Sequence, residues 1–383
     1  MAKVKLSDVI IRANTKVDKD NTDLIYYVGG EHFCSGDVTV DQKGLIAGST
    51  IGPMFYYGFK AGQFLLVSRN PHLRKAGVVN FDGICSEKTF VLESADPQVL
   101  SPAYLPFVLQ NERFWNYAVE HKHGSTNFFI NWSTLANYEF ELPELAEQER
   151  IARLAWAAQT LKKKYINQVK ATDELVKSQF IEMFADEAKR VRLDELCLHF
   201  GDGDWIESKD QSEEGIRLIQ TGNVGNGEYK DKGDKARYIS EEAFIRLGCT
   251  EVFPGDILIS RLPDPIGRAC IVPEMPKSIT AVDCTIVRLK ADVLSTFFVN
   301  FTKTPMYTMQ IDSFTTGSTR KRISRANLGS VMVPVPDLAR QERFVSIAEQ
   351  SDKSKLTIEN STNNQEETEC LQKLILKKWS ARP

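Results

Sequence analysis

The side chains that could do chemistry in this sequence are cations, gathered in two stretches that contain no acidic residue. The residues concerned are Arg320, Lys321, Arg322 and Arg325 within 313–336, and Arg69, Arg74 and Lys75 within 63–81. Guanidinium and ammonium groups bind phosphates, and arginine also makes paired hydrogen bonds to guanine. Such clusters predict either an anion-binding surface or an ordinary solvated one. The net charge of −3 does not by itself favour a nucleic-acid partner.

No catalytic motif accompanies these cations. An amino-methyltransferase needs an Asp/Asn-Pro-Pro-aromatic loop around the flipped base, and "NPHL" at Asn70 has the wrong third residue. The one glycine-rich turn, "FGDGDW" (residues 200–205), leads into a polar stretch instead of a buried helix, and no Walker A sequence occurs. The cysteines and histidines form no zinc spacing. The sequence therefore predicts no catalytic residues and no metal site.

One passage of the chain occurs twice. Residues 124–151, "GSTNFFINWSTLANYEFELPELAEQERI", and residues 317–344, "GSTRKRISRANLGSVMVPVPDLARQERF", align without a gap at an offset of 193. Eleven of the 28 positions are identical, where chance gives about two. Fainter echoes precede each copy in the same order: "KVKLSDV" with "RVRLDEL", "GQFLLVSRNP" with "GDILISRLP", "RKAGVV" with "GRACIV", and "EKTFVL" with "DCTIVR". The chain is therefore predicted to be two diverged copies of one unit.

Each copy is expected to begin with a mixed α/β domain, because short apolar runs alternate there with Gly, Pro and Asp. In the first copy the runs at 25–30, 63–68, 76–81 and 88–93 predict strands, and 101–121 predicts helices. In the second copy 216–222, 256–261, 269–273 and 284–289 predict strands, and 292–310 predicts helices. The predicted domains are 1–143, 144–189, 190–336 and 337–383.

Each copy is expected to end in a long helix. Residues 144–185 lack Gly and Pro, which predicts a helix of about 60 Å. Apolar residues at 3–4 spacing predict a coiled-coil-like seam, made of Ile151, Leu154, Ala158, Leu161 and Tyr165, then Val169, Leu175, Val176, Phe180 and Phe184. The matching segment, 337–379, is expected to be helical, with a polar stretch at 359–369 that loosens or breaks it.

These features together resemble the specificity subunits of type I restriction–modification enzymes. The resemblance rests on a variable domain, present twice, that ends in Gly-Ser-Thr and then Pro-x-Leu-x-x-Gln-Glu-Arg and leads into a long helix. Three segments of the second copy, "GDGDWIES", "GIRLIQTGNVGNGEY" and "PGDILISRLPDPIGRACIV", are similar to segments typical of target recognition domains. The resemblance covers the whole chain. It implies an α+β fold with two tandem target recognition domains and two long helices that form an antiparallel coiled coil.

The resemblance also implies a division of labour. Each recognition domain would read one half of a split double-stranded DNA site, and the helices would set the spacing between the halves. Two methyltransferase subunits would dock to make an adenine-N6 methyltransferase, and restriction subunits would complete the enzyme. S-adenosylmethionine, ATP and Mg would be bound by those partners and no cofactor by this chain. With no apolar run near the ~20 residues of a membrane span and no secretory signal, a cytoplasmic location without membrane partners is expected.

Two sets of site residues follow. The candidate DNA contacts, mostly to phosphates, are Lys60, Arg69, Arg74, Lys75, Asn127, Arg261, Arg268, Arg320, Lys321, Arg322 and Arg325. The recurring residues are expected to form the framework at the domain–helix junction and a docking surface for the methyltransferase; they are Gly124, Ser125, Thr126, Gln148, Glu149, Arg150, Gly317, Ser318, Thr319, Gln341, Glu342 and Arg343.

Alternatives remain for the recurring residues and for the function. Gln-Glu-Arg would also suit a solvated first turn of a helix. A stand-alone DNA methyltransferase or nuclease would likewise carry recognition domains, and a generic scaffold with two peptide-binding domains would explain the repeat but not the paired basic loops.

Overall fold

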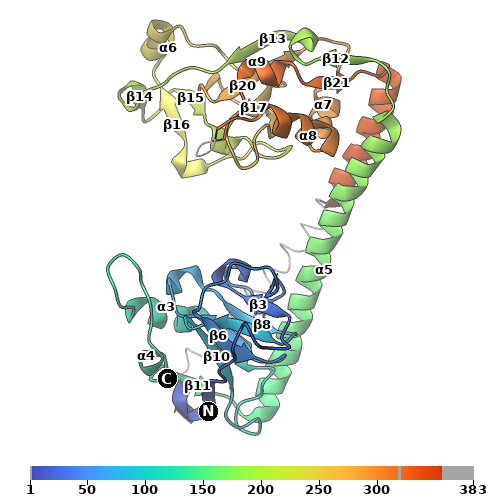
Figure 1. The fold of residues 1–383 in the computed structure, drawn as a ribbon. Helices are drawn as coiled ribbons and strands as arrows, with labels where there is room; N and C mark the ends of the chain where they lie inside the picture. The colour runs from blue at the N-terminus through green and yellow to red at the C-terminus, as the bar shows by residue number, and fades with distance from the viewer. Residues whose placement is uncertain (1, 318–320, 356–383) are drawn as a thin grey trace. The chain divides into compact units, whose positions relative to one another are not determined.

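The computed structural model of the chain describes residues 2–317 and 321–355 (Figure 1). The chain forms two compact units, residues 1–163 and 164–383. Ser318, Thr319 and Arg320 lie outside the described residues, and so does the expected second helix beyond residue 355, with its polar stretch at 359–369. In the described part of the chain, no helix is both long enough and apolar enough to cross a membrane.

The first unit is built on a five-stranded sheet of order β2-β10-β7-β8-β4 and a four-stranded sheet of order β5-β3-β9-β6. The bounds are β1 (Ala2–Lys5), α1 (Leu6–Val9), β2 (Ile10–Ala13), β3 (Tyr26–Val28), β4 (Thr39–Val40), β5 (Gly44–Leu45), β6 (Phe55–Phe59), β7 (Phe64–Val67), β8 (Ala76–Val79), β9 (Gly83–Ser86), β10 (Thr89–Ser94), α2 (Leu105–Leu109), α3 (Glu112–Glu120), α4 (Trp132–Leu135) and β11 (Glu139–Leu142). The strands and helices predicted for this domain are confirmed.

The second unit has two four-stranded sheets, of order β13-β20-β17-β18 and β14-β16-β15-β19. The bounds are β12 (Arg190–Arg192), β13 (Cys197–Asp202), β14 (Gln211–Ser212), β15 (Ile216–Ile219), β16 (Arg237–Ile239), α6 (Glu241–Leu247), β17 (Ile257–Ser260), β18 (Ala269–Ile271), β19 (Ser278–Thr280), β20 (Cys284–Leu289), α7 (Ser295–Thr302), α8 (Pro305–Phe314), α9 (Arg325–Gly329) and β21 (Met332–Pro334). The predicted strands and helices are again confirmed, so each unit contains a mixed α/β domain.

The two units repeat one framework, strand for strand. In β7–β8, Phe64 pairs with Val78, and in β17–β18 Ile257 pairs with Ile271, which is the same pair moved by 193 residues. The pair that closes each domain is also repeated, because β1 pairs antiparallel with β11 and β12 with β21. Both units further contain an equivalent parallel pair, β3 with β9 and β15 with β19, and the first unit has a second one, β4 with β8. The internal repeat seen in the sequence is therefore a repeat of backbone register.

One of the predicted echoes is misaligned by one residue. Leu65 pairs with Val91 in the first unit, and Leu258 pairs with Ile286 in the second. Val91 therefore corresponds to Ile286, whereas aligning "EKTFVL" with "DCTIVR" equates Phe90 with Ile286. Because neighbouring strand residues face opposite sides of a sheet, this slip assigns side chains to the wrong face.

The first long helix is α5 (Leu145–Phe184), one residue shorter at each end than the predicted 144–185 (Figure 1). Its first turns pack on the first domain through Ala152 and Ala155, which are buried. The Trp156 indole donates to Ala103 O at 2.9 Å, and Lys163 Nζ donates to Thr39 Oγ1 at 2.6 Å. Small alanines allow the helix to approach its own domain closely, so this face binds the domain.

The predicted seam is only partly correct. Leu154 and Leu175 were assigned to it, but their side chains are 53% and 61% exposed. In contrast, Val176, Phe180 and Phe184 lie in the core of the second unit. The seam therefore changes along α5 from a face that binds the first domain to one that enters the second core.

The second helix covers residues 338–355 in the described part of the chain and runs antiparallel to the end of α5. Arg340 donates to Met183 O at 2.8 Å, whereas Lys355, four turns later, pairs with Asp173. Between these contacts Phe344 packs edge-on against Phe180, with ring centroids 5.0 Å apart. The expected antiparallel pairing is confirmed over this range.

A buried glutamine fixes the start of α5 to the first domain. Gln148 is 1% exposed. Its Nε2 donates to Val99 O at 2.8 Å and to Pro143 O at 2.9 Å, and its Oε1 accepts from the Ser101 N–H at 2.9 Å. One amide thus joins the helix, the last residue of the domain and the loop before α2.

The same clamp occurs in the second unit at positions shifted by 193 residues. Gln341 is fully buried. Its Nε2 donates to Asp292 O and Pro336 O, both at 2.9 Å, and its Oε1 accepts from the Leu294 N–H at 3.0 Å. Both glutamines of Gln-Glu-Arg therefore lie buried where the helix meets the domain, and neither is solvated.

Replacing Gln341 with Ala should lower the free energy of unfolding of the second unit by about 2–4 kcal/mol, because three buried backbone groups lose their partner. Urea denaturation of the full chain, followed by hydrogen exchange at Leu294, measures the effect. Gln350→Ala is the matched control, since Gln350 is exposed on the same helix. Equal unfolding midpoints for the two variants would show that the clamp does not stabilise the domain.

Candidate nucleic-acid interface

A short hairpin loop closes at the same place in both units. His123 and Phe129 exchange two backbone hydrogen bonds of 2.7 and 3.0 Å, and Thr316 and Arg322 exchange two of 3.1 and 3.0 Å. These loops, residues 123–129 and 316–322, contain the recurring Gly-Ser-Thr. The two hairpin loops are therefore structural equivalents that carry different side chains.

The first glycine of each hairpin loop has a conformation that explains its recurrence. Gly124 has φ +90° and Gly317 has φ +103°, values that residues with a side chain rarely adopt. A Cβ on Gly124 would lie 2.6 Å from Asn127 O. Ser125, Thr126 and Asn127 are exposed. Gly124 thus has the expected framework role, whereas the residues after it face solvent.

The predicted contacts of the first unit separate into two places. Arg69 lies beside the hairpin loop, since it bridges Phe129, and it is exposed. Arg74 ends the turn that follows Arg69 and is half-buried. Lys75 is half-buried too, and its Nζ donates to Gly30 O at 2.7 Å. Lys60 is exposed but precedes β7, whereas Arg69 follows that strand, so Lys60 lies at the opposite end.

Further cationic groups join Arg69 without having been predicted. Lys122 Nζ lies 4.4 Å from the centroid of the Phe128 ring, and the His72 ring meets the same phenyl edge-on at 6.5 Å. The Asn70 N–H donates to Phe128 O at 2.8 Å, which fixes the turn to the hairpin loop. An aromatic ring with an ammonium group and an imidazole against it is a surface that suits stacked bases and phosphates.

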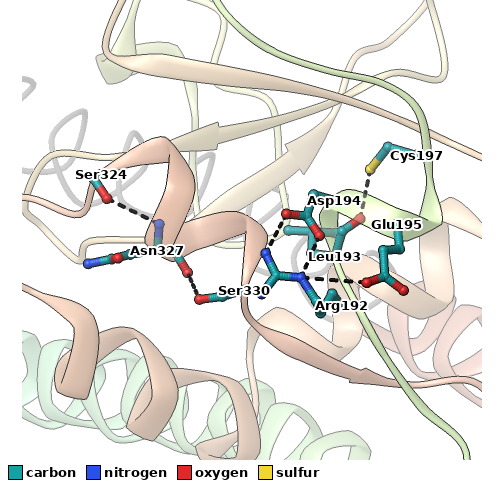
Figure 2. Close-up of polar contacts among 8 residues, drawn as sticks. All are labelled: Arg192, Leu193, Asp194, Glu195, Cys197, Ser324, Asn327 and Ser330. Atoms are coloured by element: carbon teal, nitrogen blue, oxygen red, sulfur yellow. Dashed lines mark hydrogen bonds and ion pairs between the residues drawn. The ribbon is translucent and has the colours of Figure 1, made fainter.

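In the second unit the exposed candidates are Lys321, Arg322 and Arg325. Arg325 is the first residue of α9, and its place is fixed by Ser324, whose hydroxyl accepts from the Asn327 N–H at 3.1 Å (Figure 2). Such N-caps define where a helix begins. Figure 2 also shows the ion pair of Arg192 with Asp194. The Asp194 carboxylate lies so close to Gly329, at the end of α9, that a Cβ added to this glycine would be 2.8 Å from it. Lys321, Arg322 and Arg325 are therefore held close together by a short, capped segment.

Arg268 is half-buried, and its guanidinium is bound to the protein's own backbone instead of standing free for DNA. Its guanidinium donates to five backbone carbonyls at 2.7–3.0 Å, those of Thr221, Val224, Leu262, Pro263 and Pro265. Burial lowers the pKa of this guanidinium below its usual value. Arg268 thus holds together the loop 262–266, and its donors are already occupied.

Arg261 is buried as well, being 4% exposed. It donates to Val282 O at 2.7 Å, and its Nε is 3.4 Å from Asp202 Oδ1 without a well-formed hydrogen bond. Aligning it with the exposed Arg69 is wrong, because its backbone takes the place of Ser68: the Ile130 N–H donates to Ser68 O, and the Ile323 N–H to Arg261 O. The one-residue shift turns the arginine inward.

Two carboxylates that the sequence did not single out lie among these cations. Asp283 Oδ1 is 3.7 Å from Arg322, and Asp202 Oδ2 is 3.7 Å from Arg325. Both acids are distant in sequence from the acid-free stretch 313–336. The only signal was the "GDGDWIES" segment, which contains Asp202.

A groove of about 650 Å³ lies next to this cluster in the second unit. Val282, whose carbonyl binds Arg261, is among the residues that line it, together with Gln220 and Arg237. Trp205 also lines the groove and is 71% exposed. The segment 201–208 thus places an exposed indole beside the basic cluster.

The other recurring residues lie on the surface. Glu149, Arg150, Glu342 and Arg343 are exposed, although each follows a buried glutamine directly. Arg150 pairs with Glu147 through two hydrogen bonds of 2.7 Å. The Gln-Glu-Arg motif therefore combines an internal clamp with an outward-facing charged pair.

Residues 185–367 match the family model described as the type I restriction modification DNA specificity domain. Two solved structures share the fold over nearly the whole chain. One, from a study of complex assembly and conformational transition of the type I R-M system, has a TM-score of 0.53 and 19% identity and covers 98% of this chain and 95% of that chain. The other, the type I restriction-modification system S subunit from M. genitalium, has a TM-score of 0.53 and 14% identity and covers 95% of this chain and 92% of that chain. No curated protein gives a significant match.

The fold is thus the one seen in type I specificity subunits, with two recognition domains that each lead into a long helix. Residues 185–367 match the type I DNA specificity domain, and the first unit repeats the strand register of the second in β7–β8 and β17–β18. The match favours a type I specificity subunit over the stand-alone enzyme and the generic scaffold considered from the sequence.

Replacing Arg268 with Ala should lower the free energy of unfolding of the second unit by about 2–4 kcal/mol, because five carbonyls lose a charged donor. Denaturant unfolding of the full chain measures this. Arg325→Ala, which removes an exposed arginine, should change stability by less than about 0.5 kcal/mol. A stable Arg268→Ala protein whose DNA affinity depends less on salt would instead identify Arg268 as a phosphate contact.

Proposed function

We propose that this chain reads a bipartite DNA sequence for a type I methyltransferase, with one recognition domain on each half of the site. The observation that carries the proposal is the pair of equivalent hairpin loops on one repeated framework. At matched positions the first loop presents Asn127, Phe128 and Phe129, whereas the second presents Arg320, Lys321 and Arg322. An asymmetric site needs two different readers held in the same way, which these loops would provide.

The contacts to DNA are assigned to the exposed cations around the loops. In the first domain these are the exposed Arg69, to which we add the half-buried Arg74 and Lys122 and the exposed amide of Asn127. In the second they are Lys321, Arg322 and Arg325, to which we add Arg320 from the sequence alone. Most would bind phosphates, which hold the domain on the duplex, while arginine and asparagine suit guanine and adenine. Lys60, Lys75, Arg261 and Arg268 are assigned structural or peripheral roles, because of their positions and the partners described above.

The partners follow from the family. Two methyltransferase subunits would dock near the exposed Glu149–Arg150 and Glu342–Arg343 pairs and supply S-adenosylmethionine and the adenine-N6 methylation. Restriction subunits, with ATP and Mg, would join the same complex. The complex would act in the cytoplasm, where the chromosome is found.

Exchanging residues 1–143 for another recognition domain should change one half of the methylated sequence and leave the other half intact. Genome-wide mapping of N6-methyladenine, with and without the gene, first identifies the native motif and then the motif of the chimaera. The reciprocal exchange of residues 190–336 is the control and should change the other half. A chimaera that alters both halves would contradict two independent readers, and a methylome that does not depend on the gene would contradict the proposed function.

Four residues inserted directly after Lys163 should widen the gap between the two half-sites by about one base pair. They lengthen a helix by about 6 Å, against about 3.4 Å per base pair, and the antiparallel partner helix opposes part of the movement. Four residues are close to one helical turn, so the apolar faces of α5 stay nearly in phase. Methylome sequencing compares this variant with one in which residues 164–167 are replaced by alanines without insertion. An active insertion variant with an unchanged gap would show that the helices do not set the spacing.

A further inference from the structure

Each exposed arginine around the second hairpin loop faces a carboxylate. Arg322 NH2 lies 3.7 Å from Asp283 Oδ1, and Arg325 NH1 lies 3.7 Å from Asp202 Oδ2. Both arginine side chains are 52% exposed, whereas the two carboxylates are 33% and 26% exposed. At 3.7 Å opposite charges attract without a well-formed hydrogen bond. The arginines are therefore paired loosely enough to exchange the carboxylate for another anion.

The first unit has a similar arrangement made of different residues. Glu87 precedes β10 and accepts a hydrogen bond of 3.1 Å from the Tyr56 hydroxyl. Its pKa is held below the usual value, first by the hydrogen bond from Lys88 and also by the positive charge of Arg69. Asp283 likewise directly precedes β20. Glu87 forms an ion pair with Lys88, whose backbone carbonyl accepts from the Ser68 N–H beside Arg69. An acid from the loop before the same strand thus holds a cation in both copies, one position apart in the shared register.

We propose that Asp283 and Glu87 restrain the cations of the two DNA-binding faces and thereby suppress binding to DNA of arbitrary sequence. The inference rests on the proposed function. When Arg322 turns to a phosphate it must leave Asp283, whose carboxylate then stands beside the negatively charged backbone. This cost is the same for every sequence, so it lowers the affinity for every duplex by the same factor, and only a duplex that supplies further base contacts is still held tightly.

Asp202 belongs to the same surface but has a second task. It lies 3.4 Å from the buried Arg261 and accepts a 3.3 Å hydrogen bond from Thr285 Oγ1. Neutralising it would leave a buried guanidinium without its counter-charge, so a change in DNA binding could not be separated from a loss of folding. Asp283 is therefore the residue that tests the proposal, because its side chain pairs with the exposed Arg322.

Asp283→Asn is compared with the wild type in the complex assembled with its methyltransferase subunits, using a duplex of unrelated sequence and one that contains the mapped motif. The variant should bind the unrelated duplex several-fold more tightly. Its log–log salt dependence should steepen by about 0.9, the value of one additional phosphate contact. Affinity for the motif duplex should rise by a similar factor, and the methylated motif should not change. Fluorescence anisotropy over a salt series measures both affinities.

Glu274→Gln is the matched control. It removes the same charge from an exposed position in the loop after β18, and this variant should behave as the wild type. Glu87→Gln tests the first unit independently and should act as Asp283→Asn does. Unchanged non-specific affinity in both variants would overturn the restraint. So would the loss of one defined base from the motif of Asp283→Asn, which would make Asp283 a reader of the cytosine amino group.

Arg322→Ala separates the inference from the proposed function. If it weakens binding to the motif duplex while Asp283→Asn has no effect, the DNA-binding face is retained and only the restraint is wrong. If Arg322→Ala and Arg325→Ala both leave motif binding unchanged, this face does not contact DNA and both proposals fail.

Discussion

The architecture depends on one buried side-chain amide, used twice. Gln148 and Gln341 each bind two carbonyls and one N–H from segments that are far apart in sequence. A buried amide without partners is costly, so the three contacts must form together. The helix therefore leaves each domain in one defined direction. A recognition domain can report its position on DNA only if its attachment to the helix is fixed in this way.

The domain faces show how the same framework carries different electrostatics. In the first unit an aromatic ring, Phe128, has one cation, Lys122, against it, whereas in the second the corresponding loop is itself cationic. Two acids beside the second face keep its local charge closer to balance than the acid-free stretch 313–336 suggests. The modest net charge of the chain is thus consistent with a DNA-binding role, because strongly basic faces would hold any duplex.

Much of the fold could be predicted from the sequence because the chain contains an internal repeat, so that each pattern can be checked against a second copy. Strand positions, the two-domain order and α5 all follow from matched apolar runs and from the absence of Gly and Pro over 144–185.

The site was harder to predict. Arg69 and Arg261 were aligned with each other in the sequence, but a one-residue shift buries the Arg261 side chain. The Arg268 guanidinium donates its hydrogen bonds to backbone carbonyls of its own domain. Asp202 and Asp283 come from distant strands, so no local pattern joins them to Arg322 and Arg325. Seam positions such as Leu154 failed because α5 uses its alanine face to bind its own domain.

The way the hairpin loops close has a consequence for how such proteins diversify. Both loops are tied at the base by backbone hydrogen bonds, between His123 and Phe129 and between Thr316 and Arg322, which do not depend on side-chain identity. A glycine supplies the left-handed turn in each. The residues between glycine and closure can therefore mutate from amide and aromatic to guanidinium with little penalty in stability. If the loops read DNA as proposed, a lineage could acquire a new target by point substitutions in the loop, without recombining whole domains.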